Sequence, residues 1–196
     1  MSVFASQIAK AARDGVTVDI ENRKSWAWLK ANYAAVSKRA GTYSAIKNST
    51  QEHGGIIIGR MYQFKYDPKT KDRMPFWDTF PLVLPVDRAK GGFFGINFHY
   101  LPLRERAILL DRLYDYANND RMDDSTKLRV SYGLLSRAAS LKSFQPAFKR
   151  YLYTHMRSNF LYIEPENWLT ALFIPSERFK GATTKTVWKH TKNNLS

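Results

Sequence analysis

The spacing of apolar residues along the chain changes from helical to alternating and back to helical. Trp26, Leu29, Tyr33 and Val36 recur every three to four residues, which predicts an amphipathic helix that ends at Gly41. Residues 2–13 predict a shorter helix before it, and the polar stretch 47–55 predicts a linker. Residues 1–50 are therefore expected to form a basic, helical N-terminal segment.

From residue 56 onward the period becomes two, which predicts strands. Tyr62, Phe64 and Tyr66 share one face of the first strand. The second strand, TFPLVLPVD over residues 79–87, contains two prolines that lack backbone donors, so it is expected at a sheet edge or bent. A third strand is expected over residues 93–100, with Phe94, Ile96, Phe98 and Tyr100 on one face. The two aromatic faces are interpreted as core, with a base-stacking platform as the alternative.

The glycines of VDRAKGGFFGINFHYLP, residues 86–102, raise the alternative of a phosphate-binding loop. In a P-loop the lysine follows the glycines and opens a helix, whereas here Lys90 precedes Gly91 and a strand follows. Residues 89–92 are therefore interpreted as a hairpin turn, in which glycine supplies positive φ, and no nucleotide binding is expected. Gly95 predicts a bulge or a close backbone contact.

The helical period returns after Pro102. It predicts one helix to about residue 118, a second from 128 to 142 and a third with a stripe at Phe148, Tyr151, Leu152 and His155. Residues 159–165 predict a returning strand, and residues 166–175 a short helix or turn. From Ser176 the sequence is polar and basic, which predicts a tail.

This order of elements predicts an α+β fold. A small antiparallel sheet, interpreted as an SH3-like half-barrel, is wrapped by several helices. The expected units are the N-terminal segment 1–50, a core at 56–175 and a basic C-terminal tail at 176–196.

Charge distinguishes the two ends of the chain from its middle. The net charge is +14, with 8 Lys and Arg against 3 acids in residues 1–50, 11 against 11 in 51–126, and 12 against 3 in 127–196. Such an excess at both ends favours a polyanion or an acidic protein as partner. There is no cysteine, so disulfides are excluded. Neither a membrane-spanning run nor the apolar core of a signal peptide is found, so no membrane partner is expected.

Motifs for catalysis are weak. The four histidines are scattered without metal-ligand spacing, and His99 is interpreted as structural. Asp78, Asp87 and Lys90 could be arranged as a Mg²⁺ nuclease site, but the sequence does not require it. Neither an enzyme activity, a metal nor a cofactor is expected.

The candidate contacts to DNA or a protein partner are basic residues outside the balanced middle, together with one tryptophan. Trp188 lies among lysines and is interpreted either as an anchor for the tail or as a partner contact. The candidates are Lys24, Lys30, Lys38, Arg39, Lys149, Arg150, Arg157, Arg178, Lys180, Lys185, Trp188, Lys189 and Lys192.

A family resemblance covers residues 62–113, about a quarter of the chain. The block contains YDPK, FPLV and GGFFGINFHYLP running into a helix. It resembles small virion structural proteins of T-even-type contractile-tailed bacteriophages, a group that includes the DNA-end protector. The resemblance implies a virion structural protein, which is either one that caps packaged DNA termini against host exonuclease or a neck or baseplate component.

Three functions are therefore weighed. The first is a non-catalytic virion protein that binds double-stranded DNA without sequence preference, since no base-reading motif is evident. The second is a neck, tail or baseplate subunit that contacts other virion proteins, and the third is a Mg²⁺-dependent nuclease. The expected location is the virion, after assembly in the host cytoplasm.

Overall fold

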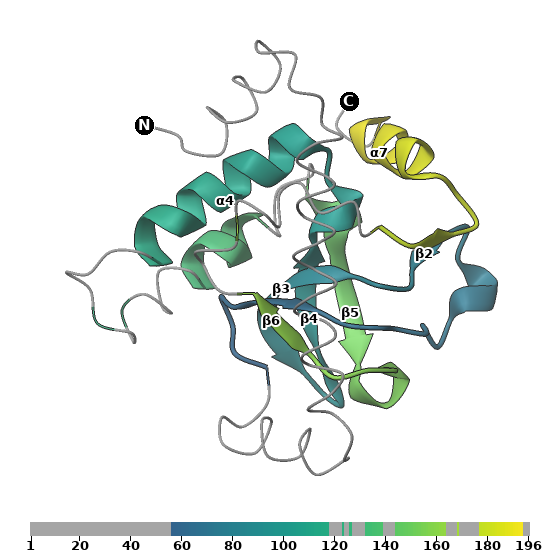
Figure 1. Cartoon of the computed structure of the whole chain (residues 1–196), viewed down its shortest axis with the longest axis horizontal. Helices are drawn as coiled ribbons and strands as arrows, with labels where there is room; N and C mark the ends of the chain where they lie inside the picture. The colour runs from purple at the N-terminus through teal and green to yellow at the C-terminus, as the bar shows by residue number, and fades with distance from the viewer. Residues whose placement is uncertain are drawn as a thin grey trace.

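The computed structural model describes residues 56–117, 123, 126, 132–138, 144–163, 168 and 177–193. They form a five-stranded antiparallel sheet, a two-stranded antiparallel ribbon, and helices (Figure 1). The elements are β1 (Met61–Gln63), η1 (Lys71–Arg73), β2 (Trp77–Asp78), β3 (Leu82–Ala89), β4 (Gly92–Asn97), η2 (Phe98–Tyr100), α4 (Leu103–Ala117), η3 (Gln145–Ala147), β5 (Phe148–Leu152), η4 (Tyr153–His155), β6 (Leu161–Ile163), β7 (Phe179–Lys180) and α7 (Thr184–Asn193). Residues 132–138 are also helical.

The main sheet has the order β5-β4-β3-β1-β6, and its neighbouring strands are antiparallel. The α+β class is thus confirmed, while the SH3-like half-barrel and the proposed domain boundaries stay predictions. No helix of the described residues is long and apolar enough to cross a membrane.

The predicted hairpin at the glycines is confirmed. β3 and β4 pair directly, and Gly91 in the turn between them has φ of 72°. Gly95 is also in close contact, because a Cβ there would overlap a methyl group of Val83.

The expectation that the proline-containing strand lies at an edge is wrong, since β3 is the middle strand. The register shifts by one residue between Pro85 and Asp87, so the predicted bend is present as a bulge. β1 pairs with β3 only at Leu82 and Val83, so Pro85 lies beyond that ladder and its missing N–H interrupts no bond to β1.

Each face of the sheet has its own core. Met61, Leu84 and Ile96 pack on the face covered by α4 and by residues 132–138. Phe64 and Phe93 pack on the opposite face, in an aromatic cluster with Tyr62, Tyr66 and Tyr151. The interpretation of these aromatic faces as core is confirmed, because Phe64 and Phe98 are 0% and 1% exposed.

The three helices predicted after Pro102 have different outcomes. The helix after Pro102 is confirmed as α4, and residues 132–138 lie within the second predicted helix. The third predicted helix is wrong: residues 148–152 form β5, which pairs with β4. Phe148 and Tyr151 lie on opposite faces of this strand, and since each face of the sheet has its own core, both are still packed against apolar residues. Pairing with the open edge of β4 satisfies backbone groups of β5.

Of the two remaining predicted strands, one is shorter than expected and one is confirmed. The third predicted strand ends early, since the Asn97 side chain accepts a hydrogen bond from the His99 amide and starts η2. The returning strand is confirmed as β6.

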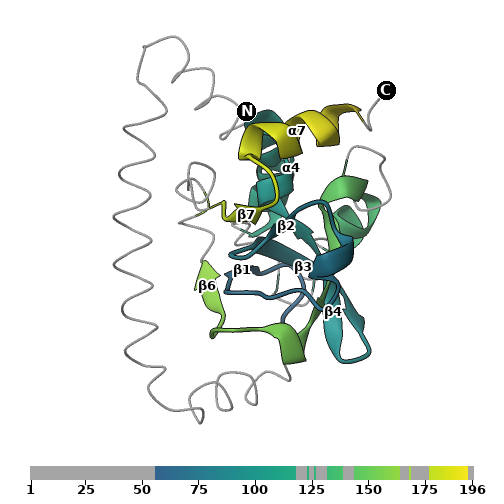
Figure 2. The ribbon, with the colours of Figure 1, turned by 90° about the vertical axis from the view of Figure 1, so that its right-hand side faces the viewer.

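The expected basic tail is instead folded. β7 pairs with β2, and α7 packs on the core with Val187 and Thr191 buried (Figure 2). The hydroxyl of Thr183 accepts a hydrogen bond from the Thr186 amide and caps the start of α7. The apolar face of α7 is too narrow to be recognised in the sequence as a helical stripe. For this reason the sequence predicts only a polar tail.

Candidate nucleic-acid interface

The predicted contact residues fall into two groups. Lys24, Lys30, Lys38 and Arg39 lie outside the described residues. The others lie on β5, after η4, on or beside β7 and on α7; they are Lys149, Arg150, Arg157, Arg178, Lys180, Lys185, Trp188, Lys189 and Lys192. Of these nine, all but Lys149 and Trp188 are exposed.

The part of the chain that carries these residues has almost no negative charge. Within residues 144–163 and 177–193, Glu177 is the one acid against the eight Lys and Arg named above. Its carboxylate is occupied, since Oε1 accepts a hydrogen bond of 2.6 Å from Arg106 Nη2. Burial opposes the charge of Glu177, but Arg106 outweighs it and lowers the pKa of the carboxyl. Glu177 is thus engaged with Arg106, while one of the eight cations, Arg157, has its Nη2 3.7 Å from Asp67 Oδ2.

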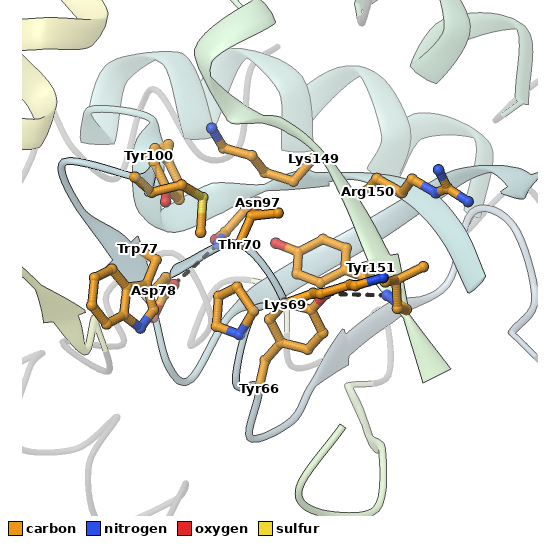
Figure 3. Close-up of a pocket in the computed structure, with 13 residues that line it drawn as sticks. Tyr66, Lys69, Thr70, Trp77, Asp78, Asn97, Tyr100, Lys149, Arg150 and Tyr151 are labelled. Atoms are coloured by element: carbon orange, nitrogen blue, oxygen red, sulfur yellow. Dashed lines mark hydrogen bonds between the residues drawn. The ribbon is translucent and has the colours of Figure 1, made fainter. Parts of the chain in front are cut away.

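A pocket of about 460 Å³ opens where β5 passes the loop between β1 and η1 (Figure 3). Four aromatic side chains and three cationic side chains contribute to its lining. They are Tyr66, Trp77, Tyr100 and Tyr151, with Lys69, Lys149 and Arg150. Aromatic rings beside cations are the groups that single-stranded nucleic acid contacts in proteins.

Lys149 is the least solvated of the three cations. Its Nζ lies 4.4 Å from the centroid of the Tyr100 ring, and Figure 3 shows the side chain reaching toward that ring. In the described part of the chain no carboxylate lies within ion-pair distance of Lys149. Burial lowers the pKa of the ammonium group. An anion that entered the pocket would offset this loss of solvation.

Arg150 and Lys69 are more exposed. Arg150 Nη2 donates a 3.0 Å hydrogen bond to the Lys90 carbonyl, which ties its guanidinium group to the β3–β4 turn. Lys69 follows Pro68 in the loop that leads to η1, and both residues line the pocket. Lys69 is not among the contact residues predicted from the sequence, although it lies in the YDPK turn.

Asp78 forms a fixed polar wall of the pocket. Its Oδ2 lies 2.6 Å from His99 Nδ1 and accepts a 3.1 Å hydrogen bond from Asn97 Nδ2, while Oδ1 accepts from the Phe80 amide. Burial opposes ionisation of Asp78, but His99 and these hydrogen bonds outweigh it and lower the pKa of the carboxyl. His99 is 0% exposed, as expected of a structural histidine.

The β2–β7 ribbon connects the pocket with the C-terminal cations. Trp77 is the register partner of Lys180, and the Thr79 amide donates to the Arg178 carbonyl at 2.9 Å. Opposed residues of an antiparallel pair lie about 5 Å apart. Lys180 is therefore next to Trp77, which lines the pocket.

Helix α7 is anchored beside the same pocket. The Thr191 hydroxyl donates to the Tyr100 carbonyl at 2.9 Å, and Trp188 Nε1 donates to the His99 carbonyl at 2.9 Å. The guanidinium of Arg106 lies 5.3 Å from the centroid of the Trp188 ring. Of the two roles expected for Trp188, these contacts support the anchor. The exposed Lys185, Lys189 and Lys192 are thereby held on a fixed helix.

The residues of the nuclease alternative are not brought together. Asp78 bonds to Asn97, whereas Asp87 pairs with Phe94 and Lys90 lies in the turn beyond. Asn97 and Phe94 are three positions apart along β4, a span of about 10 Å. Within the described residues no group of three or more His, Cys, Asp and Glu could hold a metal ion.

The fold and the site define an α+β protein in which exposed lysine and arginine side chains lie beside an aromatic pocket. The family model described as Phage T4 terminal DNA protecting protein matches residues 6–192. The chain belongs to this family. The resemblance seen in residues 62–113 is confirmed, and the match extends over most of the chain. No curated protein and no solved structure matches the chain.

Proposed function

We propose that this protein is a non-catalytic component of the phage particle that binds the ends of packaged double-stranded DNA without sequence preference. The observation that carries the proposal is the fixed cationic surface formed by β5, β7 and α7, in a chain that belongs to a family of terminal DNA protecting proteins. Bound there, the protein shields DNA termini from exonuclease.

The surface suits the phosphate backbone rather than base edges. Its exposed groups are lysine and arginine side chains, and contacts of such groups to phosphate carry no sequence information. Each phosphate that a lysine neutralises releases condensed counterions, so affinity depends steeply on salt. Sequence-tolerant binding follows from this chemistry.

The anchoring of α7 bears directly on affinity. A disordered tail loses conformational entropy when it binds, whereas Trp188 and Thr191 already hold α7 in place. Its lysines therefore meet DNA without this cost. The same argument supports α7 as part of the interface.

The test is protection of linear duplex DNA from an exonuclease, together with affinity measured over a range of salt concentrations. Wild-type protein should protect linear DNA, and replacement of Lys185, Lys189 and Lys192 by glutamine should flatten the slope of log affinity against log salt by up to about 2.7. Arg112→Gln is the matched control, an exposed cation on α4, which is not part of the proposed interface. It should leave the slope nearly unchanged.

Two results would contradict the proposal. One is a wild-type protein that leaves linear DNA fully open to the nuclease. The other is a triple variant that keeps DNA affinity and salt slope but fails to enter particles. The second result would favour the neck, tail or baseplate role, with α7 contacting other virion proteins.

A further inference from the structure

The pocket beside Lys149 has the dimensions of a small-ligand site and not of a duplex groove. Its volume of about 460 Å³ lies in the usual range for pockets that enclose one small molecule. Within a duplex the bases are stacked, so only the sugar-phosphate backbone could contact this pocket. A nucleotide at a chain end can leave the stack more easily, since it has a neighbour on one side only.

We infer that this pocket takes the terminal phosphorylated nucleotide of a DNA strand, with its phosphate on Lys149 and its base against Trp77. The inference rests on the proposed function and adds to it how an end is distinguished from the rest of the duplex. Lys69 and Arg150 also line the pocket and add positive charge to it.

The charge of a terminal phosphate explains the preference for an end. A phosphate monoester carries about −1.5 to −2 charges at neutral pH, whereas an internal phosphodiester carries about −1. Lys149 is largely shielded from water and has the Tyr100 ring, not a carboxylate, as its neighbour. In such surroundings the additional negative charge interacts more strongly than it would at an exposed lysine.

The aromatic lining accounts for the base. The Trp77 side chain is half-buried and lies at the opposite end of the pocket from Arg150 in Figure 3. An indole ring stacks with any base, so this contact adds affinity without selecting a sequence. The combination of a cation and a stacking ring favours a nucleotide over an acidic peptide, which has no comparable flat group.

Asp78 also lines the pocket, and an exposed carboxylate there would repel a phosphate. Its oxygens are occupied by His99, Asn97 and the Phe80 amide, and the residue is 4% exposed. It thus acts as a wall that holds β2 against β4. Of the three cations that line the pocket, Lys69 and Arg150 are exposed.

The experiment compares affinities for four DNA molecules of one sequence. They are a duplex with 5′-phosphates, a duplex with 3′-phosphates, a duplex with hydroxyl ends, and a dumbbell closed by a hairpin at each end. Wild-type protein should bind at least one phosphorylated duplex about tenfold more tightly than the hydroxyl duplex, as expected for one charge-assisted contact, and the dumbbell more weakly still.

Lys149→Met tests the site itself, because methionine keeps an unbranched apolar side chain and removes the charge. This variant should lose the preference for phosphorylated ends and retain its affinity for the dumbbell. Lys185→Met removes the same charge from α7 and should weaken binding to all four molecules by a similar factor. The contrast separates an end site from general electrostatic attraction.

The outcomes distinguish failure of the inference from failure of the proposed function. If wild-type protein binds the dumbbell as tightly as every open duplex, end binding is wrong and the pocket inference falls with it. If open ends are preferred but neither phosphate improves on hydroxyl, or if Lys149→Met keeps the full preference, the pocket inference alone is overturned. Should Lys149→Met fail to fold, Lys69→Gln at the exposed edge is judged by the same comparison: a reduced phosphate preference supports the site, and an unchanged preference overturns it.

Discussion

Replacing Trp188 with alanine separates an anchored α7 from a tail that only contacts a partner. The half-buried indole donates a hydrogen bond of 2.9 Å to the His99 carbonyl and lies under the Arg106 guanidinium. The hydrogen bond contributes about 1 kcal/mol and the cation–π contact about 0.5–1 kcal/mol. Lost apolar contact adds about 1 kcal/mol, so the expected destabilisation is about 2–3 kcal/mol. A fully buried tryptophan would cost about 3–5 kcal/mol, which is consistent with partial burial here.

Two measurements check this value. Thermal unfolding followed by circular dichroism should show a melting temperature lower by about 4–12 °C, given about 2–4 °C per kcal/mol for a chain of this size. Hydrogen exchange should show weaker protection of the amides of α7, because local undocking of the helix is an alternative to global unfolding. Trp188→Phe keeps a ring under Arg106 but loses the donor, and should cost about half as much.

Lys189→Ala is the control, since it changes the neighbouring exposed residue of the same helix. It should leave stability within about 0.5 kcal/mol of wild type. If Trp188→Ala also stays within that range and α7 keeps its amide protection, the indole is not an anchor. A simultaneous loss of DNA affinity would then mark Trp188 as a partner contact.

Three further predictions concern the core and the pocket wall. Gly92→Val should destabilise by about 3 kcal/mol or more in urea unfolding, because its Cβ would overlap the Tyr151 carbonyl oxygen; a loss below 1 kcal/mol would show that β5 can move away. Phe64→Ala should cost about 3–5 kcal/mol by the same assay, and an unchanged melting temperature with lost DNA binding would instead support a stacking platform. Asp78→Asn should cost about 3–5 kcal/mol near neutral pH. Since the pKa of Asp78 is lowered from 3.8 on folding, its stabilisation is present above that pH and is lost as pH falls through the folded-state value. The melting curves of wild type and variant should therefore converge in acid, and a constant gap down to pH 2 would contradict this assignment.

Local pattern determined the elements whose signals lie within one short segment. The shared packing of Tyr62, Phe64 and Tyr66, the Lys90–Gly91 turn and the helix after Pro102 all agree with the structure, although β1 itself ends at Gln63. In each case neighbouring residues supply the physical cause, which is a side-chain period, a positive φ or a fixed proline φ. The excess of positive charge in residues 127–196 was likewise evident from the sequence, and so was the family block.

Only the tertiary structure decided where those cations are placed. Residues 148–152 became a strand because β4 offered an open edge, and α7 became part of the fold because the carbonyls of His99 and Tyr100 accept bonds from Trp188 and Thr191. These hydrogen-bond partners are 89 and 91 residues apart in the chain, so no local sequence pattern could predict the contacts.

The pocket depends on the same long-range assembly. Trp77, Tyr100 and Lys149 come from three separate segments of the chain. Within its own segment, each is an ordinary aromatic or basic residue. Lys149 becomes unusual only when folding removes its solvent and leaves the Tyr100 ring as its neighbour. The sequence gives the residue types. Desolvation is a property of the folded chain, because it depends on which atoms cover each charged group.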